Sequence, residues 1–401
     1  MKPIYIAAYQ QSKFGKLLGM TVPEILRRAA EETCSSVKAE ASAVDVATVG
    51  AVCNLTLNEQ GLLSGLLAMT PGLDAKPIES VENACATGGQ AILAVASKLM
   101  LGEGDVGLAV GFEKMRDAEG KMDGKLIGKV LGYYSHPDER VGKTFVFPHL
   151  FAEVMKAYMD EWGVTEEDLA AIAVAEYENA RENPFAQMQK NQVNLESAMK
   201  IEGINRYVVD GLPLKTYDCS QISDGWAGML LATEEGLVRL GVPKADCVRL
   251  AGWGQATDPL KKEGRDVLRP KGALEAMRKA YERAGLCPDS INVAEVHDCF
   301  SVMGAIGAEV IGKAGFGKGA RYWRDGKARV DGECGINTSG GLIAKGHPIG
   351  ATGIAMVGWC AWQLLGKVPK ALQVPNARAA ATFNIGGPVC ASVCTVLTPA
   401  T

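Results

Sequence analysis

Histidine is scarce in this sequence: its 401 residues include only four, His136, His149, His297 and His347. Any histidine chemistry must therefore use these positions. The eleven cysteines are odd in number and include no Cys-x-x-Cys pair, which excludes a zinc ribbon and a small disulfide scaffold. We expect most of the thiols to be buried in a reducing compartment, and we predict a cytoplasmic location.

Charged runs are also missing. The net charge is −4 and the basic residues are scattered, which argues against nucleic-acid binding and a polybasic membrane anchor. A hydrophobic content of 47% with 22% charged residues excludes a disordered chain or a coiled coil. The apolar start is too short for a signal peptide, and the uncharged stretch 348–366 is predicted to be a buried helix rather than a membrane span.

The order of predicted elements recurs along the chain. Both parts show β-rich runs separated by helical patterns, but the last strand of the first part comes only at 226–232. The sequence therefore predicts two similar α/β halves, the first interrupted by a more polar, helical insertion. We expect this insertion to fold over a site, and the alternatives are an ornamental subdomain or an oligomer contact. The boundaries are 1–112 and 207–245 for the N-terminal half, 113–206 for the inserted domain and 246–401 for the C-terminal half.

Cys85 lies in the segment 82–89 (Glu-Asn-Ala-Cys-Ala-Thr-Gly-Gly), between a strand-like run and a helix of small residues. A thiol at a helix N-terminus has a lowered pKa, because the helix dipole and free N–H groups stabilise the thiolate. The glycines permit close approach of another backbone or of a substrate. Taken alone, the segment also fits a small buried cysteine, which is the commoner fate of this residue type.

His347 lies in the segment 346–353 (Gly-His-Pro-Ile-Gly-Ala-Thr-Gly), just before a buried helix. In the duplicated fold this helix corresponds to the one after Cys85, so the two turns belong at matching ends of the halves. A cysteine–histidine pair is a common way to activate a nucleophile. We therefore predict that Cys85 and His347 come together.

Residues 297–300 (His-Asp-Cys-Phe) follow a predicted strand directly, at the edge where α/β folds place ligands. A metal site is the alternative interpretation. A strand sends His297 and Asp298 to opposite faces, however, and no further ligands cluster nearby in the sequence. We predict acid/base chemistry and no metal.

Residues 383–388 (Phe-Asn-Ile-Gly-Gly-Pro) offer bare backbone N–H groups suited to an oxyanion hole, or form a tight turn. We assign Asn384, Gly386 and Gly387 to the active-site loop. Cys390 and Cys394 are expected in the core of the closing strand.

These four segments together resemble the thiolase superfamily, and the resemblance covers the whole chain. Cys85 resembles the acylated nucleophile, and residues 346–353 resemble the Gly-His-Pro motif. Many thiolases carry a second catalytic cysteine in a Cys-x-Gly motif, where this chain has Asn384. Many carry Asn-Glu-Ala-Phe, where this chain has residues 297–300. Both departures resemble the sterol-carrier-protein-type thiolases.

The resemblance implies a thiolase fold, with two duplicated βαβαβαββ halves stacked as an α-β-α-β-α sandwich and an inserted loop domain. It also implies an acyl-CoA acyltransferase of the acetyl-CoA acetyltransferase or 3-ketoacyl-CoA thiolase type. Cys85 would carry the acyl group, His347 and Cys299 would move protons, and His297 would stabilise an oxyanion. Substrate contacts are assigned to His149, Ser339 and Gly340.

Coenzyme A and acyl-CoA are then substrates, and no metal or redox cofactor is expected. We expect a homodimer or tetramer that serves lipid and fatty acid metabolism, with no nucleic-acid or membrane partner. Three alternatives stay open. They are a retro-aldolase of side-chain acyl-CoA working with a small acyl-CoA-binding partner, a decarboxylating ketosynthase, and a non-catalytic acyl-CoA-binding protein.

Overall fold

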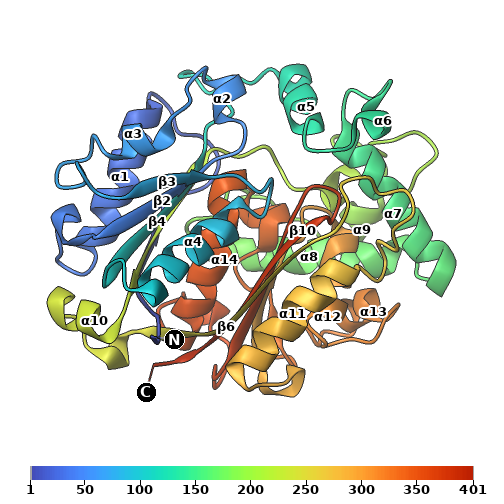
Figure 1. Cartoon of the computed structure of the whole chain (residues 1–401). Coiled ribbons are helices and arrows are strands. Elements are labelled where there is room, and N and C mark those ends of the chain that lie inside the picture. The colour runs from blue at the N-terminus through green and yellow to red at the C-terminus, as the bar shows by residue number, and fades with distance from the viewer. Residues whose placement is uncertain (1, 401) are drawn as a thin grey trace.

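The computed structural model describes residues 2–400, and Figure 1 shows two halves of β-sheet on either side of a central pair of helices. The central pair is α4 (Thr87–Leu101) and α14 (Ile349–Leu364). Helix α1 (Val22–Ser35) packs on the outer face of the first half, and α11 (Lys271–Ala284) on that of the second. The five layers alternate helix and sheet, as the resemblance to the thiolase superfamily implies.

Across residues 2–400 the strands form a mixed sheet in the order β3-β2-β4-β5-β1-β6-β10-β9-β7-β8. The order is symmetric about the β1–β6 junction, so β2 corresponds to β7, β4 to β9 and β5 to β10. This symmetry confirms the predicted duplication. The strands are β1 (Tyr5–Gln11), β2 (Val46–Gly50), β3 (Ile78–Val81), β4 (Val106–Glu113), β5 (Gly225–Ala232), β6 (Val248–Thr257), β7 (Val293–Val296), β8 (Gly335–Ile336), β9 (Ala380–Gly386) and β10 (Ala391–Pro399).

The remaining helices cover the outer faces and fill the predicted insertion, where α5 to α9 lie between β4 and β5. Residue 113, the first of the predicted insertion, still belongs to β4. The helices are α2 (Asn54–Leu57), α3 (Leu63–Leu67), α5 (Gly124–Gly132), α6 (Pro137–Arg140), α7 (Val146–Trp162), α8 (Glu166–Glu182), α9 (Leu195–Met199), α10 (Glu234–Leu240), α12 (Ser301–Val310) and α13 (Gly319–Arg324).

Helix α14 is buried almost all round because it packs against strands of both halves. A helix in that position needs no polar face, which explains the uncharged stretch that the sequence analysis assigned to a buried helix. One segment, Ala84–Leu101, is long and apolar enough to cross a membrane, and 56% of it is buried inside the fold. Core helices of water-soluble proteins meet the same criterion, so this is weak support for a membrane span.

Candidate active site

The turn around Cys85 is held in an unusual backbone conformation. Ala84, the residue before the nucleophile, has a φ of 46°, a left-handed value that costs free energy for a residue with a side chain. The Thr87 hydroxyl stabilises the turn, because it accepts the N–H of Asn83 at 2.8 Å and donates to the Ala84 carbonyl at 2.6 Å. Cys85 is thereby presented, half-buried, just before α4 begins.

The turns of Cys85 and His347 meet because α4 and α14 approach each other backbone to backbone. A Cβ atom at Gly88 would lie 2.7 Å from the Gly353 nitrogen, and one at Gly353 would lie 2.2 Å from the Gly89 nitrogen. No larger residue fits at this crossing. The glycines after Cys85 therefore serve a helix–helix contact, and the two helix starts lie side by side.

Three of the predicted catalytic side chains form one cluster. The Cys85 sulfur and a ring nitrogen each of His297 and His347 lie within 4.8 Å of one another. The two imidazoles are perpendicular, with centroids 5.1 Å apart. Both are buried, at 0% and 8% exposure for His297 and His347, so their protonation is set by protein partners rather than by water.

The hydrogen bonds of His347 assign its tautomer. Its Nδ1 lies 2.7 Å from the hydroxyl oxygen of Thr352, and that hydroxyl donates its own proton to the Pro348 carbonyl at 2.9 Å. The hydroxyl can therefore only accept from Nδ1–H, which leaves Nε2 with a free lone pair. Burial lowers the pKa of His347 to about 3. The ring is neutral and presents the base that a cysteine nucleophile needs.

His297 has the opposite tautomer. The Asn384 amide nitrogen lies 3.0 Å from His297 Nδ1 and donates to the Cys85 carbonyl at 2.9 Å, while the amide oxygen accepts the Gly89 N–H at 3.3 Å. These partners fix the orientation of the amide, so Nδ1 of His297 accepts and Nε2 carries the proton. Burial, followed by the proximity of His347, holds the pKa of His297 well below its usual value. Within residues 2–400 its Nε2 has no partner, which leaves an N–H donor for a substrate oxygen.

A thiolate with two imidazoles is also a ligand set that zinc uses. Binding a metal through Nε2 of His297 requires the tautomer with the proton on Nδ1, and the Asn384 nitrogen faces that atom. The arrangement suits proton transfer and oxyanion binding better than a metal, which supports the sequence prediction without testing it.

The predicted lowering of the Cys85 pKa is wrong. Burial raises the pKa of this thiol to about 12, and the Glu113 carboxylate adds to the rise, although the N–H of Gly387 at the sulfur opposes it. The loss of hydration raises the pKa of the thiol by more than the helix N-terminus lowers it. Cys85 and His347 therefore rest as a neutral thiol and a neutral imidazole, and the proton moves as the sulfur attacks.

Cys299 lies in the short segment between the end of β7 at Val296 and the start of α12 at Ser301. Its side chain is buried, and burial raises its pKa well above the usual value, with further rises from Cys85, Asp298 and Cys219. Cys299 rests as a protonated acid, close enough to Cys85 for the two thiols to influence each other.

The active-site loop approaches the nucleophile through its backbone. The N–H that favours the Cys85 thiolate belongs to Gly387, one of the three residues assigned to this loop. Cys390 precedes β10 rather than lying in it. Both Cys390 and Cys394 are buried, as the sequence analysis expects.

The three residues assigned to substrate contacts are not brought into the cluster. Ser339 is fully buried and donates its hydroxyl to Glu295 at 2.6 Å, and Gly340 lies against Ala180 of α8. His149 lies on α7, half-buried, with Nδ1 3.0 Å from the Phe145 carbonyl. A direct contact with substrate stays a prediction for all three.

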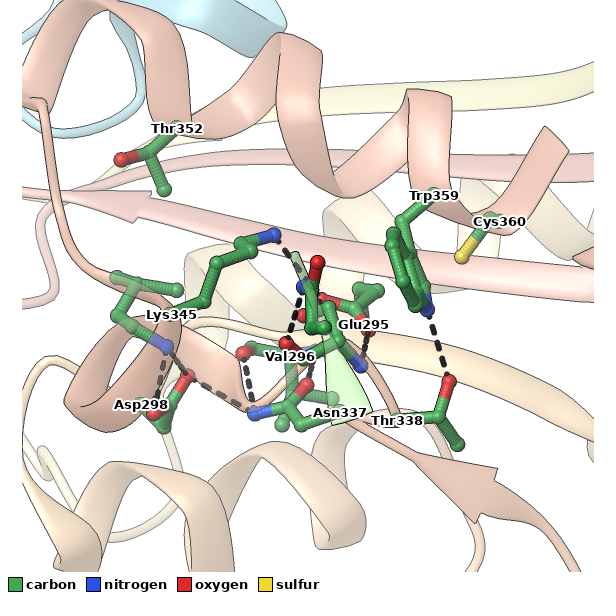
Figure 2. A network of polar contacts seen from close by, with 12 residues as sticks. Glu295, Val296, Asp298, Asn337, Thr338, Lys345, Thr352, Trp359 and Cys360 are labelled. Atoms are coloured by element: carbon green, nitrogen blue, oxygen red, sulfur yellow. Dashed lines mark hydrogen bonds and ion pairs between the residues drawn. The ribbon is translucent and has the colours of Figure 1, made fainter. Parts of the chain in front are cut away.

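Sequence reasoning missed a buried polar network behind the cluster, part of which Figure 2 shows. Asp298 accepts the backbone N–H groups of Leu342 at 2.8 Å and Ile343 at 2.9 Å, in the π-helical turn Gly341–Lys345 that leads to His347. The Asn337 side chain donates to Asp298 at 2.8 Å. The insertion joins this network, because the Asn183 side chain donates to the Ser339 carbonyl at 2.7 Å.

A further missed residue is Glu113, at the end of β4. It is fully buried and accepts the N–H groups of Cys53 at 2.8 Å, Val52 at 3.2 Å and Gly350 at 3.1 Å. One carboxyl thus ties the first half to the start of α14. The sequence signal was a glutamate at the end of an apolar strand.

A neutral imidazole base beside a cysteine, with a second imidazole presenting an N–H donor, defines an enzyme that transfers an acyl group through a thioester. The chain also matches two family descriptions, Thiolase, N-terminal domain over residues 4–235 and Thiolase C-terminal domain-like over residues 254–399. The chain belongs to the thiolase family, and it is an acyltransferase of that family.

Named relatives agree with this assignment. The chain is 34% identical to an acetyl-CoA acetyltransferase of Methanothermobacter thermautotrophicus, over 96% of this chain and 97% of the relative. It is 32% identical to sterol carrier protein 2 of Bos taurus, over 96% of this chain and 70% of that protein. It is 31% identical to the benzoylsuccinyl-CoA thiolase subunit BbsB of Thauera aromatica, over 96% of this chain and 95% of that subunit.

Two solved structures share the fold. An Ltp2-ChsH2(DUF35) aldolase superposes with a TM-score of 0.82 at 20% identity, covering 99% of this chain and 98% of its own. Human mitochondrial 3-ketoacyl-CoA thiolase superposes with a TM-score of 0.73 at 16% identity, covering 100% and 99%. At these identities the likeness concerns the fold alone.

Proposed function

We propose that this acyltransferase makes or cleaves the carbon–carbon bond of a 3-ketoacyl-CoA through an acyl group on Cys85. The observation that carries the proposal is the pair of opposite tautomers beside one thiol. A base and a donor are both required, because the reaction first generates a sulfur nucleophile and then an enolate.

In the cleavage direction, Nε2 of His347 takes the proton of Cys85 as the sulfur attacks the 3-keto carbon. The bond between C2 and C3 then breaks, leaving an acyl thioester on Cys85 and the enolate of acetyl-CoA. Nε2–H of His297, together with the proton that His347 now carries, stabilises the enolate oxygen. The Cys299 thiol protonates the enolate carbon and becomes a thiolate.

A molecule of CoA completes the cycle. The Cys299 thiolate takes the proton of the CoA thiol, and the CoA sulfur attacks the acyl thioester. The Cys85 sulfur leaves and recovers its proton from His347. The products are acetyl-CoA and a shortened acyl-CoA, with every proton returned, so CoA is a substrate and no redox cofactor is required. Condensation follows the same steps in reverse.

A retro-aldolase is the second candidate, because the superposition with the Ltp2-ChsH2(DUF35) aldolase has a TM-score of 0.82. That aldolase is named with a partner, so this candidate would bring an acyl-CoA-binding partner protein with it. The two reactions differ in one intermediate. A retro-aldol cleavage needs no acyl group on Cys85, whereas a thiolase does.

Mass spectrometry after incubation with acetyl-CoA tests the proposal. We expect an acetyl group on Cys85, and its absence would favour the aldolase. The matched control is Cys287→Ser, which removes an exposed thiol outside the cluster and should leave the acetyl adduct unchanged. A panel of 3-ketoacyl-CoA substrates, assayed with and without CoA, then defines the accepted acyl chain.

We also propose a homodimer or tetramer in the cytoplasm, serving lipid metabolism. Strand β3 is one of the two edge strands of the sheet, and its partly exposed side chains suit pairing with a second copy. All eleven cysteines are free thiols, in keeping with a reducing compartment. Sedimentation of a 42.4 kDa monomer at micromolar concentration would contradict the assembly.

A further inference from the structure

Asp298 connects the two histidine turns. It follows His297 directly, and its carboxylate accepts the backbone N–H groups of Leu342 and Ile343 in the turn that leads to His347. Figure 2 shows Asp298 beside Asn337, which also donates to it. A displacement of Asp298 would therefore move His297, Cys299 and His347 relative to one another. Whatever holds Asp298 also holds the geometry of the proposed reaction.

Glu176 of α8 reaches Asp298 from the insertion. The Asn337 amide nitrogen donates to Glu176 Oε1 and to Asp298 Oδ1, at 2.8 Å each. A Cβ atom at Gly341 would lie 2.5 Å from oxygens of both carboxyl groups, so only glycine leaves room for the pair. Glu176 and Asp298 are both fully buried.

The charges around this pair do not balance if every group is ionised. The titratable groups are Glu176, Asp298, Glu295 and Lys345, all buried. Lys345 lies 3.7 Å from Glu295 and compensates that carboxylate. Asp298 is compensated by two backbone N–H groups and Asn337, whereas Oε2 of Glu176 has no partner among the described residues. A buried carboxylate without compensation takes up a proton instead.

We propose that Glu176 is a positioning residue that keeps its proton at neutral pH and donates it in a hydrogen bond to Asp298, which fixes both histidine turns. Its predicted effect on turnover rests on the proposed function, but its protonation does not. The insertion thus contributes a neutral carboxylic acid to the support of the site.

The pKa shifts of Glu176 and Asp298 agree with a proton on Glu176. Burial, then the Asp298 charge, raises the pKa of Glu176 well above its usual value. Burial raises the pKa of Asp298 as well, but the hydrogen bonds from Glu176, Leu342 and Ile343 oppose that rise. The proton therefore resides on Glu176.

Infrared difference spectroscopy tests the protonation directly. A protonated carboxylic acid has a C=O stretch at higher frequency than a carboxylate, so the spectrum at neutral pH should contain such a band. We expect Glu176→Gln to lose this band. Glu178→Gln, two residues further along α8 and exposed, should keep it. If Glu176→Gln loses no band, the proposal is overturned, whatever reaction the enzyme catalyses.

Kinetics test the positioning role. Glutamine keeps a neutral N–H donor beside Asp298, so Glu176→Gln should retain kcat within about twofold, whereas Glu176→Ala should lose kcat on the order of 10- to 100-fold with little change in KM. Activity of Glu176→Gln as low as that of Glu176→Ala would overturn the role. If the alanine variant does not fold, the kcat of the glutamine variant and the infrared band still test the role and the protonation of Glu176.

Discussion

Asn384 Nδ2 lies 3.0 Å from His297 Nδ1 and 2.9 Å from the Cys85 carbonyl, so one amide orients the second histidine and holds the turn of the nucleophile. An amide cannot exchange protons near neutral pH. At the position where many thiolases have a catalytic cysteine, this chain therefore has a group that fixes a tautomer. The acid/base work must then fall to another residue.

Asn384→Asp should reverse the tautomer of His297. A carboxylate at this position draws the proton to Nδ1, raises the pKa of the ring and leaves Nε2 without its N–H, so cleavage of 3-ketoacyl-CoA should fall on the order of a hundredfold. Because the chain has four histidines, ¹⁵N-histidine NMR resolves the tautomer of each. Unchanged nitrogen shifts for His297 would contradict the assignment.

Thr352→Val should slow acylation of Cys85. The substitution preserves shape but removes the oxygen that accepts Nδ1–H of His347 at 2.7 Å, so the ring loses its fixed orientation and tautomer. We expect the rate of acetylation by acetyl-CoA to fall about 10- to 100-fold. Thr352→Ser keeps the hydroxyl and should restore most of the rate. Equal rates for the valine and serine variants would show that the hydroxyl has no such role.

Stability should depend on pH through Glu113. Burial raises its pKa to about 7, against about 4.3 in an unfolded chain, although three backbone N–H groups oppose the rise. The folded state binds this proton more tightly than the unfolded state does. The stabilisation that the proton on Glu113 gives the folded state is therefore complete below about pH 4.3 and is lost as pH rises towards 7. Between these values the wild type should lose on the order of 3 kcal/mol of unfolding free energy relative to Glu113→Gln.

Urea denaturation at several pH values measures this difference. The exposed Glu103→Gln variant is the control, and its pH dependence should follow that of the wild type. Parallel curves for wild type and Glu113→Gln would mean that Glu113 is ionised across the whole range.

The duplication, the buried α14 and the meeting of Cys85 with His347 were predictable because they depend on pattern. Periodicity marks the elements, and a repeat places equivalent turns at equivalent ends. The start of α8 is also marked locally, because the Thr165 hydroxyl accepts the Asp168 N–H at 3.1 Å in a capping box whose residue pattern is visible in the sequence.

The protonation states were not predictable from pattern. The pKa of Cys85 depends on how completely the fold removes water, and this burial outweighs the helix N-terminus. The partners of His297 and Asp298 come from residues distant in sequence, Asn384 and Glu176, which a local motif does not reveal. The position of Cys390 before β10 likewise depends on where the turn ends.

Cys299→Ala should separate the two halves of the reaction. Acetylation of Cys85 by acetyl-CoA should survive, because that step needs His347 and the oxyanion donors. Cleavage of 3-ketoacyl-CoA and exchange of the α-protons of acetyl-CoA should fall on the order of a hundredfold or more, since the enolate loses its acid. Burial keeps the Cys299 thiol protonated, so it is ready to act as that acid at neutral pH.

Cys390 is the rival for this role. Its sulfur lies 3.4 Å from the Gly386 carbonyl oxygen, and burial raises the pKa of its thiol, so it too rests protonated. Cys390 donates to that carbonyl and lies at the end of the active-site loop. Cys299 lies in the same segment as His297, which is the donor for the enolate oxygen. An acid must reach the carbon of the same enolate, which favours Cys299. Cys390→Ala should therefore leave proton exchange within a few-fold of wild type. If instead Cys390→Ala shows the selective loss and Cys299→Ala does not, the acid is Cys390, and the resemblance to the sterol-carrier-protein-type thiolases does not extend to the proton shuttle.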